Sequence, residues 1–205
     1  MYSEFLSHAT TYAACDKDLN DWHQGIAWYG FWAILVNDPQ WLETLHDAQQ
    51  HLKHTLLPDY ARQAHITISA SGLLDKRYFS DQHYQAQKQR LLADLPAAFT
   101  ISASYLNSFV AAPYLAIEDS CRHLLSLRSL LGKVKADDEP EIYHPHITLG
   151  LYRQTFSCEE IVTILQQFPL PELPRLKVSD IAFCRYQTAQ IQGEVEVLER
   201  IRLKT

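Results

Sequence analysis

Two short segments of the sequence carry the same residue types in the same order, 81 positions apart (146 − 65). Each places a histidine two residues before a threonine and follows both with an aliphatic side chain: His65-Ile66-Thr67-Ile68 and His146-Ile147-Thr148-Leu149. Alternate residues of a β-strand point to the same face. Each histidine is therefore expected to project beside its threonine, while the aliphatic residues anchor the opposite face in a core.

Two such pairs facing each other suit an in-line displacement at phosphorus. One imidazole takes a proton from the attacking oxygen, and the other gives a proton to the departing oxygen. The threonine hydroxyls hold the non-bridging oxygens as charge develops on them. An unperturbed imidazole has a pKa of about 6.5, so one ring can be the base and the other the acid at one pH. The structural alternative is that the histidines are hydrogen-bonded core residues and the threonines ordinary strand formers.

The elements around the two segments repeat with the same spacing. Residues 33–38, Ala-Ile-Leu-Val-Asn-Asp, align with residues 114–119, Tyr-Leu-Ala-Ile-Glu-Asp, again at an offset of 81 (114 − 33). A stretch with leucines at helical spacing follows each copy, so strand, helix and motif are all duplicated. We expect a duplicated β-α-β unit. If the two halves pack about a pseudo-twofold axis, the His/Thr pairs face each other across a cleft.

Turn and helix-start signals divide the rest of the chain. Asp38 and Pro39 predict the start of one helix, and Ser157 with Glu160 predicts a capping box at the start of another. Strands are expected over residues 25–36, 64–70, 99–109, 114–117 and 143–152, with a final hairpin of 176–186 and 191–203. Residues 1–24 are expected to form an arm before a single bilobal domain, 25–205, with halves of about 25–110 and 111–205.

The composition is that of a folded protein without a basic face. Of 205 residues, 47% are hydrophobic and 20% are charged, and the formal net charge is −6. Proteins that grip long nucleic acids by their phosphates usually carry a basic stripe. We therefore expect a small nucleotide or an RNA end as the ligand, and no long nucleic acid.

Signals for a membrane, a metal or export are not evident in the sequence. The longest nearly apolar run, residues 25–36, spans about 12 residues, against the roughly 20 that a helix needs to cross a bilayer. His46, His51 and His54 lack the H-E-x-x-H spacing of a zinc-binding helix, so no metal is expected. The four cysteines are widely spaced and no signal peptide precedes them, so reduced thiols and a cytoplasmic location are expected.

The segments His65–Ile68 and Tyr143–Gly150 resemble the paired signatures of the two-histidine (2H) phosphoesterase superfamily, which includes bacterial 2′-5′ RNA ligase-like proteins and cyclic phosphodiesterases. The resemblance covers about residues 25–203. It implies an α+β fold in which two antiparallel sheets flank a central cleft, with helices outside. It also implies hydrolysis of 2′,3′-cyclic phosphates or related small cyclic or 2′-linked nucleotide phosphodiesters without metal or cofactor, by a protein expected to be a monomer. His65 and His146 would then be the acid and base, and Thr67 and Thr148 the phosphate-holding residues.

The resemblance has one departure and leaves other contacts to be assigned. Many relatives place a basic residue three positions after the second threonine, where this chain has Leu151. Arg153 is a candidate substrate contact two positions later, and Tyr152, with the parity of the second histidine, is a candidate stacking surface for a base. Trp28 and Tyr29 are candidate contacts to a nucleobase. Two rival functions share the site: an RNA 2′-5′ ligase, and a module that binds nucleotides or RNA ends without chemistry.

Overall fold

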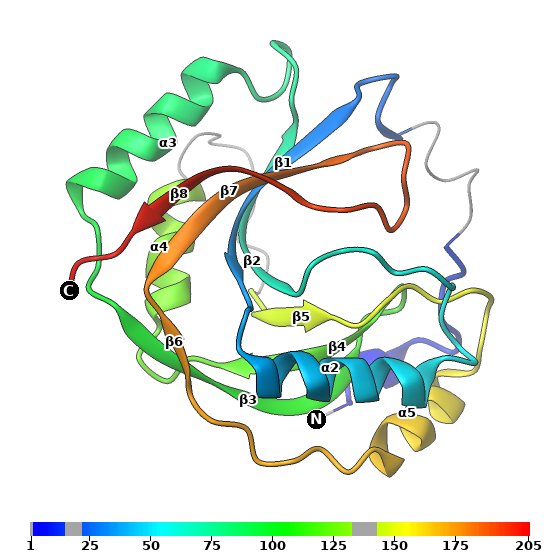
Figure 1. The fold of residues 1–205 in the computed structure, drawn as a ribbon. Helices are drawn as coiled ribbons and strands as arrows, with labels where there is room; N and C mark the ends of the chain where they lie inside the picture. Colours follow the sequence, from blue (N-terminus) through cyan, green and yellow to red (C-terminus); the bar gives the residue numbers. More distant parts are fainter. Residues whose placement is uncertain (1, 15–21, 133–142) are drawn as a thin grey trace.

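Two four-stranded antiparallel sheets form the centre of the computed structural model, which describes residues 2–14, 22–132 and 143–205 (Figure 1). The first sheet has the order β2 (His65–Leu73), β1 (Trp28–Leu35), β7 (Asp180–Gln187), β8 (Glu196–Arg202). The second has the order β5 (His146–Thr148), β4 (Pro113–Glu118), β3 (Phe99–Ser108), β6 (Leu176–Val178). The predicted α+β architecture with two antiparallel sheets is confirmed.

Helices lie beside both sheets. The described residues contain α2 (Pro39–Leu52), α3 (Asp81–Ala93), α4 (His123–Gly132) and α5 (Cys158–Gln167), and a 3₁₀ turn, η1 (Phe5–Ser7). Figure 1 shows α3 and α4 beside the first sheet and α2 and α5 beside the second. None of the helices in the described part of the chain has the length and hydropathy of a membrane span.

The duplication seen in the sequence extends to the pairing of the strands. The partners are Ala33 with Thr67 and Leu35 with His65 in the first sheet, and Tyr114 with Thr148 and Ala116 with His146 in the second. Each residue of the second set lies 81 positions after its counterpart in the first (148 − 67). The β-α-β unit is therefore duplicated in register as well as in order.

The two halves of the chain exchange elements. β3 precedes residue 110 but pairs in the second sheet, whereas β7 and β8, from the end of the chain, complete the first sheet. Gln49 of α2 donates to the carbonyl oxygen of Leu149 at 2.9 Å, and Arg128 of α4 donates to that of Ile68 at 3.2 Å. The first sheet thus receives two strands and a helix from the other half and the second sheet receives one strand and a helix, so a boundary at residue 110 does not separate the sheets.

Only one of the two predicted helix-start signals forms its cap. An Asp38 carboxylate oxygen accepts from two backbone amides of the first turn of α2, at 3.0 and 3.2 Å, and Pro39 is the first helical residue, as predicted. Ser157 precedes α5 but its side chain caps no amide, so the predicted capping box is wrong. Ser157 instead forms a β-bridge with Thr10, which ties the start of α5 to the N-terminal arm.

The N-terminal arm lies along the second sheet and its flanking segments. Backbone amides of Thr11, Tyr12 and Ala14 donate to carbonyl oxygens of residues 156, 110 and 152, at 2.9, 2.6 and 2.9 Å. These bonds place residues 11–14 next to the segment that follows β5. Residues 15–21, with Cys15, lie outside the described chain, and the described cysteines, at 121, 158 and 184, are free thiols.

Candidate active site

The two His/Thr pairs occupy the faces that strand alternation predicts. His65 and Thr67 are half-buried, as are His146 and Thr148. The aliphatic residues between and after them are buried in the core, with exposures of 1% or less: Ile66, Ile68, Ile147 and Leu149. The core therefore holds one face of each strand. Each His/Thr pair projects from the other face of its strand, β2 or β5.

The two imidazoles are held by the same hydrogen bond. Nδ1 of His65 lies 2.7 Å from the carbonyl oxygen of Gln63, and Nδ1 of His146 lies 2.7 Å from that of His144. A carbonyl oxygen only accepts, so each Nδ1 carries the proton and donates it. In the neutral ring, Nε2 of each histidine then has a free lone pair and can take a proton from another molecule.

The surroundings of both histidines favour the neutral imidazole. Burial lowers the pKa of His65 to about 4, with smaller effects from the charge of Arg62 and from His146 when that ring is protonated, although the bond to Gln63 opposes this. Burial also lowers the pKa of His146 below its usual value, against the bond to His144. Both rings are therefore neutral at pH 7 in the free protein, and both can act as bases.

Aromatic rings pack against both imidazoles. The ring of Phe31 lies 5.2 Å from that of His65. The ring of His146 packs against Phe109, at 4.9 Å, and Tyr114, at 5.2 Å, and these two rings stack on each other. These rings contribute to the burial that lowers the pKa of each imidazole.

The strands that carry the two pairs are joined directly. β2 and β5 are in contact, and the hydroxyl of Tyr143 donates to the carbonyl oxygen of Thr67 at 2.8 Å. Tyr143 lies three residues before His146, so this bond ties the start of the second motif to the middle of the first. The electrostatic effect of His146 on His65 reflects the same proximity. The structure thus brings the two His/Thr pairs into one site.

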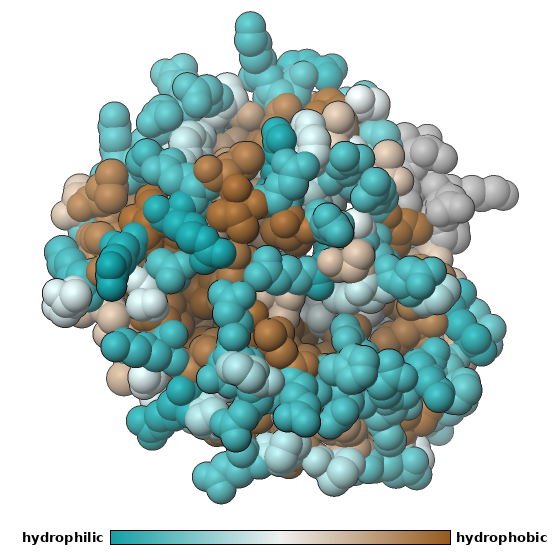
Figure 2. All heavy atoms as spheres, in the orientation of Figure 1, coloured by the Kyte–Doolittle hydropathy of each residue, from teal (hydrophilic) through white to brown (hydrophobic). Residues whose placement is uncertain are grey.

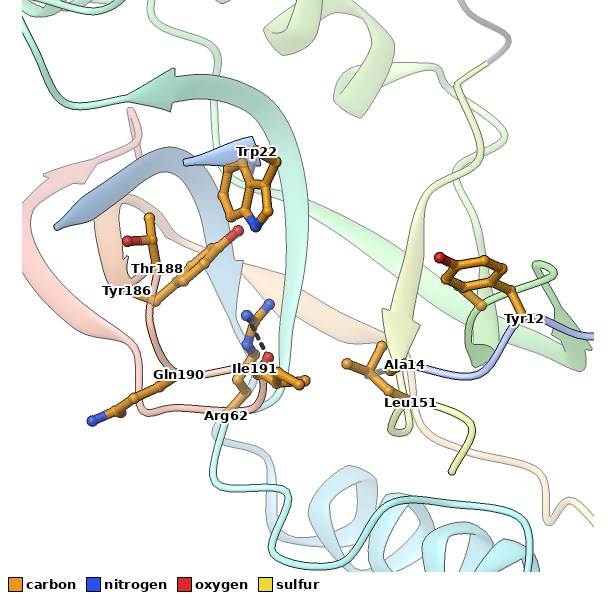
Figure 3. A pocket seen from close by; sticks show the side chains of 10 residues that line it. Tyr12, Ala14, Trp22, Arg62, Leu151, Tyr186, Thr188, Gln190 and Ile191 are labelled. Atoms are coloured by element: carbon orange, nitrogen blue, oxygen red, sulfur yellow. Dashed lines mark hydrogen bonds between the residues drawn. The ribbon is translucent and has the colours of Figure 1, made fainter. Parts of the chain in front are cut away.

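Arg62 lines two cavities, and of the two His/Thr pairs only Thr148 lines one of them, the smaller. The larger, of about 270 Å³, is lined mainly by aromatic and apolar residues, among them Tyr12, Trp22, Leu151, Tyr186, Ile191 and Arg62. Figure 3 shows Tyr186, Trp22 and Arg62 on one side, facing Ala14 and Leu151 across the cavity. The smaller, of about 150 Å³, is more polar, and its lining includes His46, Gln49, Tyr60, Arg62 and Thr148.

A row of aromatic side chains leads from His65 toward the larger cavity. Phe31 lies beside both His65 and Tyr186, and Tyr186 stacks on Tyr29 with ring centroids 5.2 Å apart. Trp22 meets the ring of Tyr29 edge-on at 5.6 Å. Figure 2 shows hydrophobic side chains gathered over the middle of one face of the molecule, with hydrophilic ones around the rim. Aromatic rings beside the candidate catalytic groups suit a nucleobase.

Residues 36–190 match the sequence model of the 2′-5′ RNA ligase superfamily. The chain belongs to this superfamily. The predicted membership of the 2H phosphoesterases is therefore confirmed, and it accounts for the duplicated motifs and the paired sheets. No curated protein sequence is significantly similar to the chain.

Solved structures that align over nearly their whole length share the fold of this chain at low sequence identity. Escherichia coli LigT without ligand is 16% identical, with 88% of this chain and 100% of that chain covered at a TM-score of 0.60. E. coli LigT complexed with 3′-AMP is 17% identical, with 88% and 100% covered at a TM-score of 0.58. TT0787 of Thermus thermophilus is 20% identical, with 86% and 98% covered at a TM-score of 0.58.

Of the two predicted substrate contacts that follow the second motif, the structure contradicts that of Tyr152. Tyr152 is fully buried and its hydroxyl lies 2.7 Å from Oγ of Ser108, so it cannot stack on a base. Arg153 is exposed and lines neither cavity, and its contact with the substrate stays a prediction. The physical reason is that β5 ends at Thr148, so the alternation of faces cannot be extrapolated to residues 151–153.

The predicted contacts on β1 fall on opposite faces of the sheet. Tyr29 lies in the aromatic row described above. Trp28 faces away, under the guanidinium of Arg185, whose carbon is 3.8 Å from the ring centroid. Adjacent strand residues point to opposite faces, so only one of the two could reach the site, and the expectation for Trp28 is wrong.

Sequence reasoning missed Arg62 and Tyr186, which lie beside the two His/Thr pairs. The guanidinium carbon of Arg62 is 4.0 Å from the ring centroid of Tyr186, and Nη2 donates to the carbonyl oxygen of Ile191 at 3.0 Å. Arg62 precedes His65 by three residues, and this closeness to the first motif is the signal by which the sequence could have indicated it as a site residue. Within the described chain, no three or more side chains of His, Cys, Asp or Glu are grouped to hold a metal ion.

Proposed function

We propose that this superfamily member hydrolyses 2′,3′-cyclic phosphates, or related small 2′-linked nucleotide phosphodiesters, by acid–base catalysis with two histidines and without a metal. The observation that carries the proposal is the matched pair of imidazoles: in each, Nδ1 donates to a carbonyl oxygen, so Nε2 of the neutral ring is the atom with a lone pair to accept a proton. Membership of a phosphoesterase and ligase superfamily supports this class of chemistry. The complex of E. coli LigT with 3′-AMP supports a ligand of nucleotide size.

The reaction uses one imidazole in each protonation state. Water attacks phosphorus, and Nε2 of the neutral histidine takes the proton that the water loses. The bond from phosphorus to the water oxygen forms as the bond to the ribose O2′ or O3′ breaks, and the second histidine gives that oxygen a proton. The product is an acyclic phosphate monoester. The two histidines then exchange their protons with solvent.

The negative charge of the substrate phosphate favours the protonated histidine that acts as the general acid. Both imidazoles are neutral in the free protein because burial disfavours the imidazolium. An anionic phosphate between them raises the pKa of the nearer ring and so favours one protonated histidine. The hydroxyls of Thr67 and Thr148 donate to the non-bridging oxygens, where negative charge grows in the transition state.

A small ligand fits the charge of the chain and the size of the cavity. The formal net charge of −6 disfavours long nucleic acid, and a cavity of about 270 Å³ with aromatic walls suits one nucleoside. The proposal includes a cytoplasmic location and a monomeric protein, both of which are predictions from the sequence.

The test separates hydrolysis from its two rivals. The purified chain is incubated with 2′,3′-cyclic AMP, and ³¹P NMR follows the conversion of the cyclic phosphate to a monoester, with and without EDTA. We expect turnover that EDTA does not change. Joining of RNA ends through a 2′-5′ bond without net hydrolysis would favour a ligase. Binding of the nucleotide without any product would favour a binding module, and inhibition by EDTA that added metal reverses would contradict the metal-free mechanism.

A further inference from the structure

We propose that Arg62 binds the phosphate of the substrate and supplies the fixed positive charge of the site. The inference rests on the proposed function, since it assigns a residue to the reaction that the two histidines perform. It concerns a residue that lies outside both His/Thr motifs, in the segment that leads into β2.

The position of Arg62 is the first argument. It is a wall residue of both cavities: in the larger one it lies beside Tyr186 and faces Leu151 (Figure 3), and it lines the smaller one together with Thr148. Among the described residues that line the two cavities, Arg62 alone carries a permanent positive charge. A phosphate held by Thr148 would therefore lie beside its guanidinium.

The second argument is that the charge of Arg62 is not neutralised. The described part of the chain contains no ion pair between Arg62 and a carboxylate, and its buried Nε has no hydrogen-bond acceptor there. A buried donor atom on a half-buried guanidinium costs free energy when no acceptor satisfies it. A phosphate oxygen provides both the negative charge and the acceptor that are lacking.

The third argument is that Arg62 is held in place before a ligand arrives. The ring of Tyr186 lies under the guanidinium, and the carbonyl oxygen of Ile191 accepts from Nη2 at 3.0 Å. A cation fixed in this way needs little reorganisation to stabilise charge that develops in the transition state. Leu151, across the same cavity, carries no charge, so the cavity depends on Arg62 for its fixed positive charge.

Arg185, in β7 of the first sheet, gives a matched control. Arg185 also stacks on an aromatic ring, that of Trp28, but on the opposite face of the sheet and in an ion pair with Glu196 at 2.8 Å. R62M and R185M therefore each remove one arginine from an aromatic stack. Only R62M removes it from the site.

The experiment measures turnover of 2′,3′-cyclic AMP and, by calorimetry, binding of inorganic phosphate to wild type, R62M, R62K and R185M. We expect R62M to lose roughly 10²–10³-fold in kcat/KM, as for the loss of one strong oxyanion donor, and to lose phosphate binding. R62K should recover part of both, because it restores the charge without the planar guanidinium. R185M should match wild type.

A pH titration tells a role in the site from a role in folding. The charges that act on the His65 imidazole come from Arg62, in the segment before β2, and from His146 on β5. R62M should therefore raise the pKa of His65, read from its imidazole NMR signals, while R185M leaves it unchanged. If R62M lacks the native circular dichroism, R62Q, which removes the charge but keeps an amide donor, decides instead.

The outcomes separate the inference from the proposed function. Equal turnover and equal phosphate binding in the neutral Arg62 variant and R185M would overturn the inference and leave the two-histidine reaction standing. A wild-type protein that binds phosphate through Arg62 but turns over no phosphodiester would support the inference and overturn the function.

Discussion

His65 and His146 have the same tautomer, because Nδ1 of each donates to a carbonyl oxygen two residues earlier at 2.7 Å. Their surroundings nevertheless differ. The charges of Arg62 and His146 both disfavour a proton on His65, whereas the nearby titratable group that lowers the pKa of His146 is His144. We therefore expect His65 to be the base and His146 the acid in the direction of hydrolysis.

This assignment predicts how each histidine variant responds to the leaving group. A 4-nitrophenyl ester of a nucleoside phosphate releases an anion that needs no proton, so the general acid becomes dispensable. H146A should then recover much of the roughly 10²–10⁴-fold that it loses on the cyclic phosphate, and H65A should not. Steady-state rates on both substrates measure this. The reverse pattern of recovery would exchange the two roles.

The low pKa of His65 predicts a loss of stability in acid. Its pKa is about 4 in the folded protein and about 6.5 when unfolded, so the unfolded chain takes up the proton first as the pH falls. The contribution is fully present above pH 6.5 and is lost between pH 6.5 and 4, by on the order of 3 kcal/mol. Urea unfolding at pH 7 and at pH 4 should show a smaller loss for H65Q. An equal loss in H65Q and wild type would contradict the lowered pKa.

The two threonines should contribute to rate and little to stability. T67V and T148V keep the shape of a half-buried strand residue but remove the hydroxyl that the mechanism assigns to the phosphate. We expect each to lower kcat/KM roughly 10²-fold or more, with native circular dichroism. T163V, which loses a hydroxyl on the exposed face of α5, is the control and should retain full activity. Full activity in T148V would remove that threonine from the mechanism.

Tyr152 should behave as a core residue. Its hydroxyl lies 2.7 Å from Oγ of Ser108 in a buried pair. Y152F should therefore lower the free energy of unfolding by about 1 kcal/mol and leave kcat/KM unchanged. Urea unfolding and turnover of 2′,3′-cyclic AMP measure the two effects. A raised KM with unchanged stability would return Tyr152 to the substrate site.

The central features of the site could be predicted from the sequence because they are local. Strand alternation fixes the faces of a histidine and a threonine two residues apart, whatever the rest of the chain does. The offset of 81 then predicted the second copy and the duplicated unit, whereas the pair of antiparallel sheets was expected from the family resemblance. The Asp38 cap is local in the same sense, since its acceptor and donors lie within three residues.

The features that sequence reasoning missed depend on contacts between distant segments. Arg62 meets Tyr186 and Ile191, more than 120 residues later, and no pattern around residue 62 signals that contact. Tyr152 was misplaced because β5 ends four residues before it, which the apolar run through Leu149 does not show. The exchange of strands and helices between the halves likewise depends on tertiary packing and not on local propensity.

The most direct test of the two-histidine site compares turnover of 2′,3′-cyclic AMP by wild type, H65A, H146A and the double variant, with H54A as a control on an exposed histidine. Residues that act as a unit lose about as much singly as together. We predict that each single variant of the site is nearly inactive, that the double variant is no worse, and that H54A is unchanged. Substantial hydrolysis by either single variant, with native circular dichroism, would contradict the account.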